Sequence, residues 1–187
     1  MKKLILIILP FIITSCVETV AVGSLGTAYL MTRAKTVKDS VSDAKIAADI
    51  TSKIKLSKER KELKNLNYNV YQGRVLLTGS VADKKILDKA IAKIWDIKGV
   101  KELMNETDIN EKEEKHNTAF DHLLATNIKT RLFLNEKIKS LDINVEVYDK
   151  KVFLIGNLNS DYEIRAAAQI AAKVKGVKEV TSYLRSI

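Results

Sequence analysis

Two stretches of the sequence decide the fold: Val70-Tyr71-Gln72-Gly73-Arg74-Val75-Leu76-Leu77-Thr78-Gly79 and Val147-Tyr148-Asp149-Lys150-Lys151-Val152-Phe153-Leu154-Ile155-Gly156. Each consists of two short β-branched, aliphatic and aromatic runs on either side of a polar pair, Gly73-Arg74 in the first and Lys150-Lys151 in the second. This pattern is typical of a β-hairpin. Residues 98–102 and 175–179 then share the sequence Lys-Gly-Val-Lys-Glu. The chain therefore contains an internal duplication, which predicts two small domains of one design.

Both copies predict the element order α-β-β-α-β from their hydrophobic periodicity. For the first copy the expected elements are helix 43–56, strands 66–71 and 75–81, helix 83–98 and strand 100–109. For the second they are helix 119–134, strands 143–148 and 152–158, helix 160–176 and strand 177–187. We expect Asp83 and a Ser160/Glu163 capping box to begin the two later helices, and Gly99 and Gly176 to end them.

The expected fold class is α+β, with two tandem α-β-β-α-β domains at 43–109 and 119–187. Each is a three-stranded mixed sheet packed on two helices. Residues 110–118 are dense in charge and lack periodicity, which predicts a linker. Residues 16–42 are small and apolar at first, and we interpret them as a spacer that follows the signal peptide 1–15.

The N-terminus predicts a secreted, lipid-anchored protein. Two lysines precede an apolar run that is too short to span a bilayer, as in a secretory signal. Ile13-Thr14-Ser15-Cys16 resembles the lipobox of bacterial lipoproteins, and Cys16 is the single cysteine of the chain. We therefore expect Cys16 to carry the lipid anchor. In such lipoproteins a residue other than aspartate after the cysteine, here Val17, is compatible with the outer membrane.

No catalytic or cofactor motif is apparent in the 187 residues. His116 and His122 have no further histidine or cysteine at ligand spacing, and the sequence lacks a G-x-S-x-G elbow, a phosphate-binding loop and a dinucleotide fingerprint. We expect a protein that is not an enzyme and that uses no cofactor or metal. Its net charge of +9 favours an acidic partner.

Three features of the sequence resemble the BON domain of bacterial envelope proteins. They are the pattern V-x-L-x-G at the end of the hairpin, the alanine-rich last helix and the pattern G-V-x-x-V that follows it. The resemblance covers about four-fifths of the chain and is closer in the second domain, since the first has Trp95 where the second has Ala172. It implies a periplasm-facing protein at the outer membrane that binds anionic phospholipid, through the first helix of a BON domain, and supports outer-membrane integrity.

The first helix of the second domain is the candidate lipid-binding element. A buried stripe of Leu124, Ile128 and Leu132 would leave another side of the helix facing outward. That side holds the candidate residues Phe120, Leu123, Asn127, Thr130 and Arg131. Apolar side chains beside a cation are the combination that interfacial binding uses. The first domain has only polar residues at the equivalent positions, namely Ser42, Lys45, Asp49, Ser52 and Lys53.

Three functional hypotheses follow from the sequence. The first is a lipid-anchored protein that binds an anionic phospholipid membrane, with Lys129 and Lys137 adding to the charge of Arg131. The second is a periplasmic interaction or chaperone-like module that binds other envelope proteins, for which Phe120 and Leu123 serve equally well. Alternatively, both residues pack against the first domain or the linker. The third, an RNA-binding protein, is disfavoured because neither domain contains an internal Gly-x-x-Gly loop. The oligomeric state stays open.

Overall fold

The computed structural model describes residues 42–110, 117–138 and 140–187. Cys16, His116 and most of the expected spacer and linker lie outside these ranges. The described residues belong to one compact unit, Val37–Ile187. Within them, no helix is both long enough and apolar enough to cross a membrane.

The first domain has the expected order of elements. A helix over residues 42–55 precedes the hairpin of β1 (Leu66–Tyr71) and β2 (Arg74–Val81), which is followed by α2 (Lys84–Trp95). The expected last strand is divided into β3 (Glu102–Asn105) and β4 (Asp108–Ile109). Both pair in parallel with β2, and β1 pairs antiparallel with it. The sheet is therefore mixed, with β2 at its centre.

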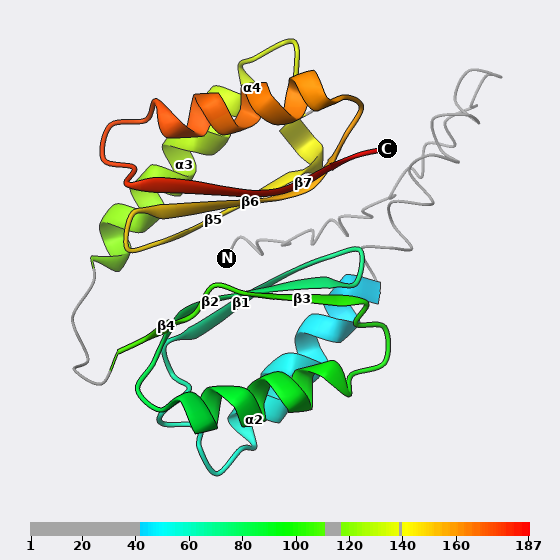
Figure 1. Ribbon diagram of the computed structural model, residues 1–187, viewed down its shortest axis with the longest axis vertical. Helices are drawn as coiled ribbons and strands as arrows, with labels where there is room; N and C mark the ends of the chain where they lie inside the picture. Colours follow the sequence, from blue (N-terminus) through cyan, green and yellow to red (C-terminus); the bar gives the residue numbers. More distant parts are fainter. Residues whose placement is uncertain (1–41, 111–116, 139) are drawn as a thin grey trace, which may run out of the picture. The chain divides into compact units, whose positions relative to one another are not determined.

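The second domain repeats this arrangement. Its elements are α3 (Thr118–Phe133), the short 3₁₀ helix η1 (Ser140–Asp142), β5 (Ile143–Tyr148), β6 (Lys151–Leu158), α4 (Asp161–Ala172) and β7 (Glu179–Ser186). The sheet order is β5-β6-β7, with β6 antiparallel to β5 and parallel to β7. In each domain the two helices lie on one face of the sheet (Figure 1). The predicted α+β fold is confirmed.

The hairpin turns differ from the prediction by one residue. The loops are Gln72-Gly73 and Asp149-Lys150, all four residues have positive φ, and Arg74 and Lys151 already belong to the strands. Positive φ at both central residues is the type I′ conformation, whose twist matches that of a two-residue hairpin. The strand twist therefore determines which pair forms the turn, and polarity alone placed it one residue too late.

An aspartate in the first helix of each domain holds this turn. Asp43 accepts hydrogen bonds from the backbone N–H groups of Gln72 (2.6 Å) and Gly73 (2.8 Å). Asp121 accepts the equivalent bonds from Asp149 (2.8 Å) and Lys150 (2.9 Å). The carboxylates accept hydrogen bonds from turn N–H groups that have no partner in the strands. They also connect the first helix of each domain to its hairpin.

The predicted helix starts are confirmed, whereas the helices end earlier than expected. The Asp83 side chain accepts a hydrogen bond from Lys85 N–H (2.7 Å), and Ser160 accepts one from Glu163 N–H (3.3 Å). However, α2 ends at Trp95 and α4 at Ala172, each with a further turn before the glycine. Gly99 and Gly176 have φ of +104° and +103°, so both adopt the left-handed conformation in that turn.

Each domain has its own hydrophobic core between its helices and its sheet. The predicted stripe Leu124, Ile128 and Leu132 is buried in the second core, together with Val152 and Leu154 of β6. The first core contains Ile46 and Ile50 of the first helix. Burial of these side chains stabilises each domain separately, at about 1.5–3 kcal/mol for each large aliphatic residue.

A third apolar cluster joins the two domains through the sheet faces that carry no helix. Leu76 and Met104 of the first domain pack with Tyr148, Phe153 and Ile155 of the second. Tyr71 and Tyr183 lie partly buried against them, so Tyr71 and Tyr148, which hold equivalent positions in the repeated hairpin, both have a structural role. The helical spacing of Trp95 with Ile91 and Ile94 predicts packing at the interface between the domains, but Trp95 lies on α2 and is about half exposed. That expectation was wrong because the interface is made by strands.

Polar contacts at this interface use matching positions of the two repeats. Aligned through the repeated hairpin, Arg74 corresponds to Lys151 and Glu106 to Tyr183. Arg74 donates to the backbone carbonyl of Tyr183 (2.9 Å), Lys151 forms an ion pair with Asp108 (2.9 Å), and Glu106 contacts Tyr183 directly. Burial, followed by the Glu106 carboxylate, raises the pKa of the Tyr183 hydroxyl to about 12.

Candidate functional site

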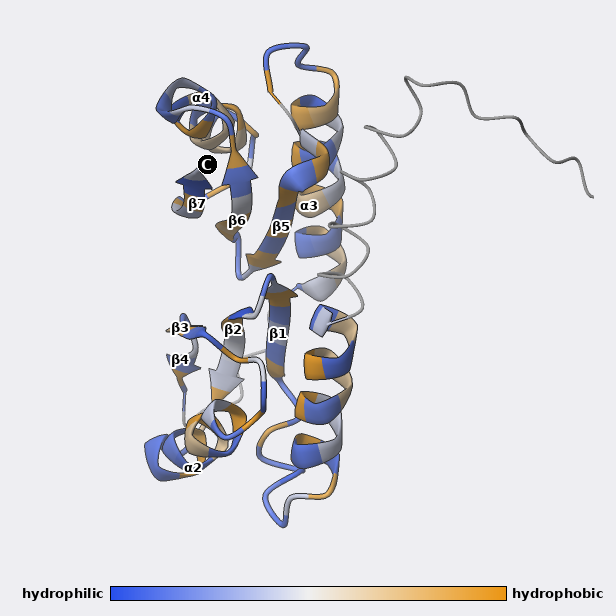
Figure 2. Cartoon of the chain, turned by 90° about the vertical axis from the view of Figure 1, so that its right-hand side faces the viewer, coloured by the Kyte–Doolittle hydropathy of each residue, from blue (hydrophilic) through white to orange (hydrophobic). Residues whose placement is uncertain are grey.

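One side of α3 presents the residues that the sequence singled out. Leu123, Asn127, Thr130 and Arg131 are all exposed, and Leu123 is 68% exposed. Leu134, which caps the helix, falls on the same side and is 72% exposed. We refer to Leu123, Asn127, Thr130, Arg131 and Leu134 as the α3 strip. Figure 2 shows apolar and polar residues alternating along this helix.

Phe120 does not belong to the strip. Its ring is half-buried against the second core, and a Cβ atom added at Gly176 would lie 2.8 Å from the ring carbon Cζ. The Lys150 ammonium lies 5.7 Å from the ring centroid, within the range of a cation–π contact. The expectation that Phe120 faces outward was therefore wrong. Gly176 has no side chain, and the space this leaves lets the ring fold onto its own domain.

The positive charge of the strip comes from Arg131. Its Nε–H donates to the Asn127 side-chain oxygen (2.7 Å), which holds the guanidinium along the helix surface. Lys129 lies on the opposite side of α3, near Glu146 of β5. Burial raises the pKa of Glu146, and the positive charges of Lys129 and His122 oppose that rise. Lys129 is thus placed to interact with its own sheet rather than with a ligand of the strip.

Leu134 was missed by the sequence reasoning. It is the final residue of the helix expected at 119–134, and the helical wheel that selected Leu123 places it on the same side. The strip therefore has an apolar residue near each end, with Asn127, Thr130 and Arg131 between them. In the first domain the positions of Leu123, Asn127, Thr130 and Arg131 are occupied by polar residues, as expected, whereas the position of Leu134 is occupied by Leu56, which is also exposed.

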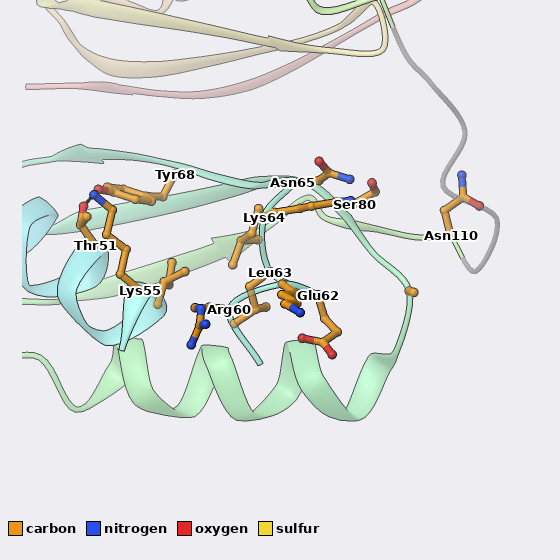
Figure 3. Close-up of a pocket in the computed structure, with 14 residues that line it drawn as sticks. Thr51, Lys55, Arg60, Glu62, Leu63, Lys64, Asn65, Tyr68, Ser80 and Asn110 are labelled. Atoms are coloured by element: carbon orange, nitrogen blue, oxygen red, sulfur yellow. Dashed lines mark hydrogen bonds between the residues drawn. The ribbon is translucent and has the colours of Figure 1, made fainter. Parts of the chain in front are cut away.

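The first domain instead contains a cavity that the sequence did not indicate. It has a volume of about 850 Å³ and lies between the end of helix 42–55, the connection 56–65 and the β1 edge of the sheet. Thr51 and Tyr68 lie at one end, and Asn65, Ser80 and Asn110 lie toward the other (Figure 3). Its size falls within the range of small-molecule sites, about 300–1,000 Å³.

The described ranges contain no group of three or more histidine, cysteine or acidic residues arranged to hold a metal ion. Within these ranges, the α3 strip and the first-domain cavity are the candidate surfaces for a ligand.

Both repeats match the model of one protein family. The BON domain model matches residues 42–111 and 120–186, which together make up more than half of the chain. The chain belongs to the BON-domain family. The α3 strip is therefore on the first helix of the second BON domain, and the cavity is in the first BON domain.

Three relatives match this chain over most of their own length. The chain is 30% identical over 186 residues to a Haemophilus influenzae protein named outer membrane lipoprotein DolP, covering 99% of this chain and 96% of that one. It is 33% identical over 138 residues to an uncharacterised Anaplasma centrale protein, covering 71% and 90%. It is 29% identical over 151 residues to a 21 kDa hemolysin of Actinobacillus pleuropneumoniae, covering 81% and 75%.

Proposed function

We propose that the protein is a non-enzymatic envelope lipoprotein that binds anionic phospholipid through the α3 strip and supports outer-membrane integrity. Cys16 would carry the lipid anchor at the outer membrane, with both BON domains in the periplasm. The similarity over almost the whole chain to a protein named as an outer membrane lipoprotein supports the placement. The observation that carries the binding proposal is the exposure of Leu123 and Leu134 on the same helix side as Arg131.

The size of the strip fits weak, reversible binding. Fully burying a leucine side chain contributes about 1.5–3 kcal/mol, and a basic residue near an anionic bilayer contributes about 1 kcal/mol. Leu123, Leu134 and Arg131 together therefore give a few kcal/mol, which is weak for a protein free in solution but measurable at millimolar lipid. A lipid anchor raises the effective concentration of the strip at the bilayer, so the same interaction is adequate for a tethered protein.

Co-sedimentation with liposomes tests this proposal. The chain beginning at Val17 retains the whole compact unit Val37–Ile187 and lacks the anchor, so its binding reports the protein surface without a lipid chain. We expect it to bind vesicles that contain phosphatidylglycerol, to bind less at moderate salt, and to bind pure phosphatidylcholine weakly. The variant Leu123→Ser/Leu134→Ser should lose the binding.

The matched control is Leu56→Ser/Ile187→Ser, which replaces two equally exposed apolar residues outside the strip. It should bind like the unchanged chain. Absence of binding to both vesicle types, or an equal loss in the control variant, would contradict the lipid proposal. The exposed leucines of the strip would then favour a protein partner in the envelope.

A further inference from the structure

The cavity of the first BON domain exists where the second domain has a closed core. Aligned through Asp43 and Asp121, Ile54 corresponds to Leu132, which is 1% exposed, whereas Ile54 is only partly buried. Aligned through the repeated hairpin, Tyr68 of β1 corresponds to Val145 of β5, which is 4% exposed, whereas Tyr68 is only partly buried. The same design thus leaves one end of its core open in the first domain.

The walls of the cavity are held in place by specific contacts. The Tyr68 hydroxyl donates to the Ala47 carbonyl (3.0 Å) and contacts the Thr51 hydroxyl, which fixes the ring against helix 42–55. On the far side, the connection 56–65 is fastened to α2 through Glu59, whose carboxylate lies 3.7 Å from Lys89 and from Lys93. The hydrogen bond from Ser57, together with these cations, lowers the pKa of Glu59 to about 2. The cavity is therefore a preformed space between anchored elements.

The lining has two chemical parts. Its apolar part includes Ile54, Leu63 and Leu66. Its charged part has four cations, Lys55, Arg60, Lys61 and Lys64, and one carboxylate, Glu62. These cations are exposed, and no ion pair of Lys55, Arg60 or Lys61 is found among the described residues. Figure 3 shows Lys55 on the helix and Arg60 on the connection.

We propose that this cavity binds one molecule of a single-chain anionic lipid, a fatty acid or a lysophospholipid. The acyl chain would lie along Ile54, Leu63 and Leu66, and the carboxylate or phosphate would contact Lys55 and Arg60. An apolar interior with a few charged groups at its mouth is the usual composition of such a site. The excess of cations selects a negative head group. This site lies in the other domain from the α3 strip and does not depend on bilayer binding.

Calorimetric titration of the chain beginning at Val17 tests the proposal. The probes are decanoate and lysophosphatidylglycerol, each below its micelle concentration, and the uncharged alcohol decanol, below its solubility limit. We expect one-to-one binding of an anionic probe and binding of decanol at least about tenfold weaker, because charge-assisted hydrogen bonds to the head group are lost. Binding of decanoate alone identifies a free fatty acid as the ligand source, and binding of lysophosphatidylglycerol identifies a phospholipid source.

Variants locate the site. Lys55→Gln/Arg60→Gln changes two exposed side chains and should weaken binding of the anionic probe about tenfold. Lys85→Gln/Lys98→Gln makes the same change of charge away from the cavity and should have no effect. Ala82→Trp adds bulk at an exposed lining position and should also reduce binding. The α3-strip variant Leu123→Ser/Leu134→Ser should bind normally, which separates this proposal from bilayer binding.

Three results would overturn the proposal: equal binding of decanol and decanoate, binding that neither Lys55→Gln/Arg60→Gln nor Ala82→Trp reduces, or no binding of either anionic probe. Amide NMR spectra give an independent check of position. The anionic probe should shift the signals of Thr51, Tyr68 and Ser80, which line the cavity. Shifts confined to the α3 strip would contradict the assignment.

Discussion

Replacement of Asp121 by alanine should strongly destabilise the second domain. The Asp121 carboxylate is 5% exposed and accepts two hydrogen bonds from the hairpin turn, at 2.8 and 2.9 Å. Each hydrogen bond to a charged group contributes about 1.5–3 kcal/mol, and the two bonds share one acceptor group, so their contributions are not additive. We expect Asp121→Ala to lower the free energy of unfolding by about 3 kcal/mol. For a chain of this size the midpoint of thermal unfolding should fall by about 6–12 °C.

Urea unfolding, monitored by circular dichroism, measures this change in the free energy of unfolding. Related variants show whether the loss is specific to the Asp121 hydrogen bonds. Asp121→Asn keeps one acceptor oxygen and should lose about half as much stability. Asp43→Ala removes the equivalent clamp of the first domain, where the aspartate is less buried, and should cost less than Asp121→Ala. Glu136→Ala, at an exposed acidic residue, should change stability by less than about 0.5 kcal/mol. A loss below about 1 kcal/mol for Asp121→Ala would refute the role of the clamp.

Two further changes test other parts of the fold. Gly156→Ala should lower the free energy of unfolding of the second domain by at least about 2 kcal/mol in urea, because the new Cβ would lie 1.9 Å from the Asp142 carbonyl oxygen. An unchanged free energy of unfolding would mean that this backbone shifts easily. The raised pKa of Tyr183, about 12 against an ordinary 10, makes a contribution to stability that is present below pH 10 and is lost as the pH rises from 10 to 12. Stability curves of Tyr183→Phe should therefore fall less steeply in that window, and identical slopes would contradict the Tyr183–Glu106 contact.

The duplication and the order of elements could be predicted because they rest on local signals. The repeated hairpin, the helical spacing of Leu124, Ile128 and Leu132, and the Ser160/Glu163 box each depend on residues close in sequence. The turn position failed by one residue in both copies because polarity alone selected the pair, and in the second copy Asp149-Lys150 contains no glycine to mark positive φ. The Asp121 carboxylate, which lies far from the turn in sequence, helps to hold that conformation.

The interface and the position of Phe120 depend on contacts that no local pattern contains. One signal was present: Val152, Phe153, Leu154 and Ile155 form an unbroken apolar run, which is typical of a strand buried on both faces. The run predicts a covered second face, but not what covers it. A helical wheel gives the direction of Phe120, whereas the space at Gly176 that receives the ring becomes evident only in three dimensions.

The interface between the domains has the pattern of a two-fold homodimer within one chain. Tyr71 and Tyr148 are equivalent positions, as are Leu76 and Phe153, and all four belong to the same apolar cluster. In an isologous dimer both subunits use the same surface patch, as these two repeats do. A gene that encoded only one repeat would leave that patch exposed and would favour association with a second copy.

Fusion of such a dimer would free its halves to evolve independently. In a homodimer every substitution appears in both subunits, whereas here each repeat can change while its partner keeps the shared patch covered. Two differences between the repeats lie away from the interface: the second repeat has apolar residues on the outside of α3, and the first has an open end in its core. Duplication thus allows the two copies of one domain to specialise separately.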